Sequence, residues 1–206
     1  AIDFTTSIWS QHLNSDIPIK VNIYADDLGE LFLGFSLPNG RKNFSGAPLG
    51  DVWYVSCLAN SISATELNPG EADMNIFINT SESLYLGTDG NTAGQIDFVT
   101  LLLHEIGHGL GGVSAGNMTG NIGSIGTLSQ VDWQPLVSSF PWQDMEELPT
   151  VWDSFIITGD GESIVNENVF PNPSPQLGDQ YRSNDLYFSG AATTAANGGV
   201  SPRVFA

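Results

Sequence analysis

An apolar run that passes directly into two histidines four residues apart constrains this chain more than any other feature. The run covers residues 96–103, and the string His104-Glu105-Ile106-Gly107-His108 follows it without a break. Its apolar side chains recur at helical spacing, in the two rows Phe98, Leu102, Ile106 and Val99, Leu103, Leu110. Next, Gly109, Gly111 and Gly112 favour a helix end in the left-handed conformation. We therefore predict one buried helix that carries both histidines.

The spacing of the two histidines suits a metal ion. Residues four apart lie one above the other on a helix, so His104 and His108 can bind one ion together, and neutral imidazole is a good zinc ligand. Glu105 stands beside that ion and can act as a general base on a metal-bound water. The string is typical of zinc peptidases. A helix whose histidines only satisfy hydrogen bonds in the core is the weaker interpretation.

The helix and its surroundings resemble the zincin metallopeptidases. The longer string at residues 104–111 is similar to that of a group of secreted bacterial zincins, and weaker similarities lie at residues 53–60, 78–81, 85–90 and 185–190. The resemblance implies a zincin-like α+β fold, with a twisted mixed sheet, an active-site helix and a largely irregular C-terminal part. It also implies a zinc-dependent endopeptidase in which His104 and His108 bind Zn2+ and Glu105 is the catalytic residue.

One zinc ligand is not apparent in the sequence. In the metzincin pattern a third histidine follows, but this chain matches only the intervening Gly111 and has Ser114 at the ligand position. The remaining histidine, His12, lies far upstream in a polar stretch and is interpreted as a surface residue. Because a catalytic zinc usually has three protein ligands and a water, a further ligand is required.

Three sources of that ligand are open. The similar zincins continue past their Phe-Ser-Gly segment into a Gly-Ser-Ser-x-Ser-His stretch, whereas the sequence given ends at Ala206, so the ligand can lie beyond it. A downstream carboxylate is the second source, and the candidates are Asp132, Asp144, Glu146, Glu147 and Asp153. Two histidines with additional waters, or a weakly held metal, are the third. We favour the first source and place a carboxylate second.

The charge of the chain limits its partners. Lys and Arg number 5 against 23 Asp and Glu, which gives a formal net charge of −18. This balance argues against nucleic acid and anionic membranes as partners, and it suits a monomeric, secreted protein. No apolar run is long enough to span a bilayer, and the absence of a basic leader fits a mature extracellular form. We expect protein or peptide substrates.

Cys57 is the single cysteine, so no disulfide can form within the chain. Its apolar neighbours predict a buried and unreactive thiol. Two acidic clusters, residues 88–91 with Asp97 and residues 159–162, suggest Ca2+ as a second metal. Neither has the EF-hand spacing, and Asp-Gly pairs are more often simple turns.

The remaining patterns predict alternating elements in the first half and little regular structure in the second. Helices are expected at residues 7–13 and 51–62, and strands at residues 17–24, 31–36 and 73–79. In the second half we expect a loop at 111–127, a short helix at 132–140, a short apolar element at 151–157, no regular structure around Pro171, Pro173 and Pro175, and a weakly structured tail at 191–199.

The resemblance gives residues 74–79 a specific role. In zincins an antiparallel edge strand ahead of the metal helix lines the cleft and receives extended substrate backbone, which is a sound mode of peptide binding. An ordinary interior strand fits these residues equally well. Both interpretations are open at this point.

Length and a hydrophobic content of 41% predict a single domain over residues 1–206, with an upper lobe at 1–112 and a lower part at 113–206. The resemblance implies that this domain is a zincin-like catalytic domain. We predict that it hydrolyses peptide bonds through a zinc-activated water. The competing hypothesis is a non-catalytic zincin-fold binding or surface module with an incomplete metal site, for which Ser114 is the evidence.

Overall fold

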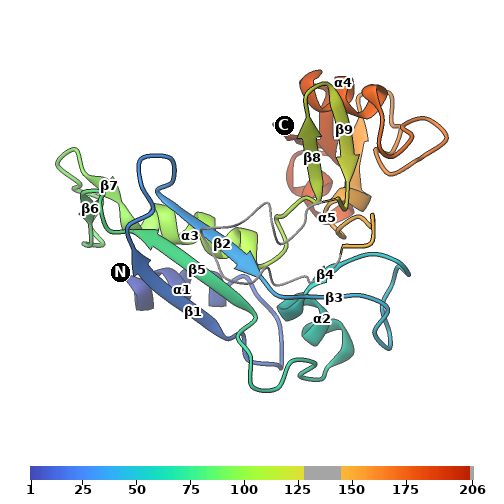
Figure 1. Ribbon diagram of the computed structural model, residues 1–206. Helices are drawn as coiled ribbons and strands as arrows, with labels where there is room; N and C mark the ends of the chain where they lie inside the picture. Colours follow the sequence, from blue (N-terminus) through green and yellow to red (C-terminus); the bar gives the residue numbers. More distant parts are fainter. Residues whose placement is uncertain (128–144, 205–206) are drawn as a thin grey trace. The chain divides into compact units, whose positions relative to one another are not determined.

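The computed structural model describes residues 1–127 and 145–204, where α-helices alternate with small sheets (Figure 1). The chain is therefore α+β, as predicted. Contacts divide the described residues into two compact units, which we call unit 1 (residues 1–48 and 54–112) and unit 2 (residues 49–53, 113–127 and 145–204). Within these residues, no helix has both the length and the apolar character needed to cross a bilayer. The helix predicted at 132–140 lies outside them.

Unit 1 is built on a three-stranded mixed sheet in the order β1-β5-β2. Its strands are β1 (Val21–Asp26), β5 (Met74–Asn79) and β2 (Gly34–Pro38). β5 runs parallel to β1 and antiparallel to β2, so that Phe77 lies opposite both Tyr24 and Phe35. Two further pairs complete the unit: β3 (Gly40–Arg41) with β4 (Tyr54–Val55), and β6 (Leu84–Tyr85) with β7 (Ile96–Asp97).

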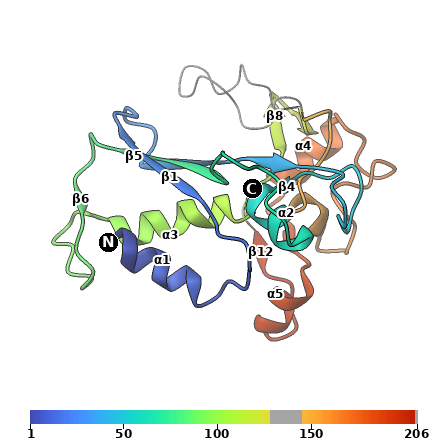
Figure 2. The same cartoon turned by 90° about the horizontal axis from the view of Figure 1, so that it is seen from below.

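Two helices cover one face of this sheet. Figure 2 shows α1 (Ile2–Ser10) and α3 (Phe98–Gly109) on the same side of the strands. Strand alternation turns Met74, Ile76 and Ile78 of β5 toward the core, where they are at most 4% exposed. The buried residues of α3 include Phe98, Val99, Leu102 and Ile106, so the predicted apolar helix is confirmed.

β5 is the central strand of the sheet, so of the two interpretations of residues 74–79 the edge strand is wrong and the interior strand is confirmed. Both of its edges are paired, from Val21 opposite Met74 on one side to Gly34 opposite Ile78 on the other. Interior strands of this kind have no free backbone groups for a peptide. The antiparallel edge strand next to α3 is β2 instead.

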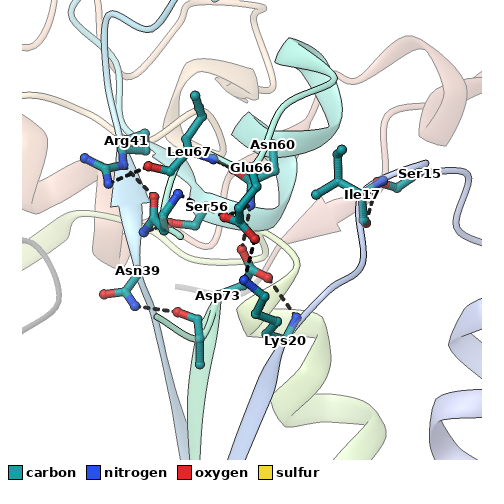
Figure 3. A network of polar contacts seen from close by, with 12 residues as sticks. Ser15, Ile17, Lys20, Asn39, Arg41, Ser56, Asn60, Glu66, Leu67 and Asp73 are labelled. Carbon is teal, nitrogen blue, oxygen red and sulfur yellow. Dashed lines mark hydrogen bonds and ion pairs between the residues drawn. The ribbon is translucent and has the colours of Figure 1, made fainter. Parts of the chain in front are cut away.

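A polar network fastens the start of β5 to the start of β1 and to α2 (Ser56–Ser63), as Figure 3 shows. The carboxylate of Asp73 accepts hydrogen bonds from the backbone N–H of Lys20 at 2.8 Å and from Nδ2 of Asn60 at 3.0 Å. Nζ of Lys20 lies 2.7 Å from Oε2 of Glu66, which also accepts from Asn60 through Oε1. Burial raises the pKa of Asp73, with Glu66 adding to the effect. This network fixes where the parallel pair begins.

Helix positions in unit 1 differ from those predicted. The first helix runs over Ile2–Ser10 rather than residues 7–13, because the side chains of Ile2 and Phe4 are about 45% exposed and give no buried stripe to detect. The second begins only at Ser56, because Asp51 has a φ of 55° and β4 keeps the chain extended before it. Cys57 lies in this helix and is buried, as predicted.

Unit 2 contains more regular structure than expected. The predicted loop at 111–127 contains a hairpin of β8 (Gly116–Thr119) and β9 (Ile122–Ile125). Between them stand Gly120, with a φ of 63°, and Asn121, a pair that favours two-residue hairpin turns. The high glycine content of the segment had concealed this local signal.

The proline-rich region and the tail of unit 2 are also partly helical, which corrects two expectations. α4 (Pro175–Arg182) begins with Pro175 in its first turn, where a missing N–H costs nothing, and Ser174 caps it by accepting from Leu177 N at 3.0 Å. The tail forms α5 (Ala191–Ala196). The apolar element expected at 151–157 is present as the 3-10 turn η2 (Asp153–Phe155) and the strand β10 (Ile156–Thr158), which joins a sheet with β11 (Leu186–Phe188) and β12 (Arg203–Val204).

Candidate metal centre

α3 places the two predicted histidine ligands side by side in unit 1. The ring centroids of His104 and His108 are 4.5 Å apart with planes at 89°, and their Nε2 atoms are 3.0 Å apart. His104 is exposed and His108 is half-buried. The helix itself is set by Asp97, whose carboxylate caps its first turn by accepting from the N–H of Thr100 at 3.3 Å.

The backbone just after α3 fixes the orientation of His108. Its Nδ1 lies 2.6 Å from the carbonyl oxygen of Gly112. Because a carbonyl only accepts, Nδ1 carries the hydrogen, and the lone pair of the neutral ring is on Nε2, the atom that faces His104. A hydrogen bond from the second ring nitrogen to a backbone carbonyl is a common feature of metal-binding histidines. Gly112 was not predicted as part of the site.

Glu105 lies beneath β2 and is 4% exposed. A Cβ at Gly34 would be 3.6 Å from Cγ of Glu105, so this strand covers the glutamate stem. Within the described residues, Oε2 of Glu105 is buried without a hydrogen-bond partner. Burial raises the pKa of Glu105, and the neighbouring His108 opposes that rise. An unpartnered buried carboxylate oxygen is costly to a fold and is often a sign of function.

The observed atoms fit one zinc ion in part. Two Zn–N bonds of about 2.0–2.1 Å near the tetrahedral angle separate their nitrogens by roughly 3.3–3.4 Å. The Nε2 atoms of His104 and His108, 3.0 Å apart, would have to separate by only a few tenths of an ångström. Oε2 of Glu105 is covered by protein atoms in this arrangement, so it would have to become exposed to a metal-bound water to act as its base. The two histidines therefore fit two ligands, and Glu105 fits a base only in that case.

Asp153 does not fit the role of third ligand, because hydrogen bonds already saturate its carboxylate. Its Oδ1 accepts from Oγ of Ser114 at 2.5 Å, and its Oδ2 accepts from the N–H of Ala115 and from both N and Oγ1 of Thr150, each at 2.9 Å. The residue is fully buried in unit 2. We assign Asp153 a structural role, and Ser114 is one of its donors rather than a metal ligand.

No group of three His, Cys, Asp or Glu side chains suited to a metal ion occurs in residues 1–127 and 145–204. Glu146 and Glu147 are exposed and belong to no such group. Asp132 and Asp144 lie outside the described residues. His12 is exposed in the turn after α1, which agrees with its interpretation as a surface residue.

The first acidic cluster considered for calcium serves other contacts in the structure, and the second contains a simple turn. The Oδ1 atom of Asp89 accepts from the hydroxyl of Tyr85 and from the N–H of Asn91, while Asp97 caps α3. In the second cluster, Thr158 and Gly161 are joined by a turn hydrogen bond of 2.9 Å. Calcium at either place remains a prediction.

Comparison with other proteins adds no assignment. No protein-family model, curated protein or solved structure matches this chain. The chemistry of the site therefore has to be argued from its own geometry.

Proposed function

We propose that this chain is a secreted zinc-dependent metalloendopeptidase of zincin type. The observation that carries the proposal is the arrangement on α3: two imidazoles with converging Nε2 atoms, next to a buried carboxylate with an unpartnered oxygen. Peptide hydrolysis at neutral pH requires these groups together.

Each residue has one role in the proposed reaction. His104 and His108 would hold Zn2+ through Nε2, and the bond from Nδ1 of His108 to Gly112 keeps its ring in place. When bound, zinc would lower the pKa of a coordinated water to about 7 and polarise the scissile carbonyl. Glu105 would be the general base for that water and would return the proton to the leaving amine. Its burial, which raises its pKa, suits a group that must both take and give a proton.

The substrate is proposed to be an extended protein or peptide chain, bound along β2. Within the described residues β2 pairs only with β5, so its other edge is open to strand addition. Gly34 on this strand packs against Glu105, so a peptide along this edge would pass close to the catalytic group. A net charge of −18 disfavours nucleic acid and anionic membranes as alternatives.

A second candidate function is supported by one specific observation. The described residues offer two histidines but no third protein ligand, which is what a non-catalytic binding or surface module with an incomplete metal site would show. Such a module would hydrolyse nothing, whether or not it held zinc. The two hypotheses differ in activity, not in fold.

The substitution Glu105→Ala separates them. We expect the wild-type protein to cleave an unstructured protein such as β-casein in the presence of Zn2+, and a chelator to stop the cleavage. Glu105→Ala should lower the rate by about 10²-fold or more, because a positioned general base contributes that much. Zinc content should stay nearly unchanged, because Glu105 is not a ligand.

Two outcomes would contradict the proposed activity. The first is wild-type activity in Glu105→Ala. The second is a wild-type protein that binds zinc and cleaves nothing. Zinc bound without any cleavage would favour the non-catalytic module.

A further inference from the structure

Trp9 of α1 reaches the backbone of α3 at the turn that carries the candidate metal ligands. Its indole N–H donates a hydrogen bond of 3.3 Å to the carbonyl oxygen of Leu103, the residue directly before His104. A Cβ at Gly107 would be 3.7 Å from Cζ2 of the same indole, so the ring lies over Gly107. Trp9 therefore contacts both ends of one helical turn.

That turn adjoins the row of the two histidines. Residues 103 and 107 lie one above the other, and His104 and His108 form the neighbouring row, about 100° around the helix. A carbonyl oxygen has two lone pairs, so that of Leu103 can accept a hydrogen bond from Trp9 and a helical backbone hydrogen bond at the same time. The indole thus holds the backbone of the turn without breaking it.

His104 depends on this backbone more than His108 does. His108 has a hydrogen bond from Nδ1 to Gly112 that orients its ring. Within the described residues, the hydrogen bond recorded for His104 is the one to His108, whose Nε2 is the atom that would bind metal. The position of His104 is therefore set chiefly by the helix backbone beneath it.

We propose that Trp9 is a positioning residue for His104, acting through the carbonyl of Leu103 and the surface of Gly107. This inference rests on the proposed zinc site but assigns a role to a residue outside the motif. The role is positional, because Trp9 touches neither the metal nor the reacting atoms.

The substitution Trp9→Phe tests this role, because it keeps an apolar ring over Gly107 and removes the N–H. The matched control is Trp53→Phe, since the indole of Trp53 donates to a backbone carbonyl in unit 2, that of Met145, at 3.0 Å. Both variants lose the same kind of hydrogen bond. Zinc affinity and the visible spectrum of the Co2+-substituted full chain are measured for wild type and both variants, together with the free energy of unfolding.

We expect Trp9→Phe to weaken zinc binding roughly threefold to tenfold, the effect of losing one supporting hydrogen bond, and to change the Co2+ spectrum. Trp53→Phe should leave the zinc affinity and the Co2+ spectrum unchanged, even if it lowers the free energy of unfolding as much as Trp9→Phe does. A measurement on the wild type is independent of how the variants fold: the indole N–H resonance of Trp9 should shift on zinc addition, and that of Trp53 should not.

The role of Trp9 is overturned if Trp9→Phe binds zinc and Co2+ as the wild type does, or if the Trp9 resonance does not move while zinc binds. Those results leave the proposed metal site intact. A wild-type chain that binds no zinc removes the metal site and the role of Trp9 together.

Discussion

At the scale of single residues, two buried acids show how differently a carboxylate can be used. Asp153 accepts four hydrogen bonds, whereas Oε2 of Glu105 has no partner in the described residues. A buried polar group without a partner costs about 1–3 kcal/mol. Saturation fits a structural acid, and a buried oxygen without a partner, on the helix that carries both histidines, fits a reactive one.

The substitution Asp153→Asn tests the structural role. The new amide N–H₂ would face donors from Ser114, Ala115 or Thr150, so we expect a loss of about 2–3 kcal/mol in the free energy of unfolding, measured in urea. Zinc content should not change. A variant of unchanged stability that loses its zinc would show that Asp153 is a ligand after all.

Cys57 provides a prediction about pH. Burial raises the pKa of its thiol to about 12, with Asp73 adding to the rise. Because the folded pKa exceeds the unfolded value of about 8.5, the stability that the neutral thiol gives is complete below that pH and is lost as pH rises toward 12. We expect the difference in unfolding free energy between wild type and Cys57→Ala to shrink between pH 9 and 11.

Thiol titration checks the same claim directly. At pH 8 the native protein should not react with a disulfide reagent such as DTNB, whereas the unfolded chain should react fully. Rapid reaction of the native protein would mean that Cys57 is accessible.

At this scale, the sequence allowed His104, Glu105 and His108 to be predicted because helical spacing is a local property. It did not indicate Gly112 or Trp9. Gly112 acts through a backbone carbonyl, which any residue has, and Trp9 is separated from its partner Leu103 by 94 positions. Contacts of these two kinds leave no periodic signal in a single sequence.

At the scale of elements, glycines decide how closely unit 2 packs. A Cβ at Gly178 on α4 would clash with the carbonyl oxygen of Asn121 and lie 2.8 Å from the backbone nitrogen of Gly123. All of these neighbours are backbone atoms and cannot rotate away. The close contact between α4 and the hairpin therefore needs glycine at this position.

The substitution Gly178→Ala should lower the free energy of unfolding by about 2–3 kcal/mol, measured by urea denaturation. The control is Gly107→Ala, also in a helix, where the new Cβ meets only Cζ2 of Trp9 at 3.7 Å. That variant should be unchanged or more stable by up to about 1 kcal/mol, because alanine favours helix. Equal effects of the two substitutions would show that packing at Gly178 is loose.

Elements with strong periodicity were predicted well, and those that depend on context were not. α3 and β5 lie where their patterns placed them. α4 was missed because prolines were taken as excluding regular structure, although Pro175 after Ser174 marks a helix start. The position of β5 within its sheet could not be predicted, because pairing partners far apart in the sequence determine it.

At the scale of the whole molecule, the proposed function depends on one unit and the stability on both. The candidate ligands, Glu105, Trp9 and the open edge of β2 all lie in unit 1. Unit 2 has its own buried acid at Asp153 and its own sheet. From the net charge of −18 we predict that copies of the chain repel one another.

Zinc bound per chain, measured by elemental analysis, tests directly whether His104 and His108 bind zinc. The exposed His12 supplies a matched control, since the chain has three histidines in all. After equilibration with Zn2+ and gel filtration, wild type and His12→Ala should each retain about one zinc ion, and His104→Ala and His108→Ala should lose it. Equal zinc in all four proteins, or none in the wild type, would contradict the account.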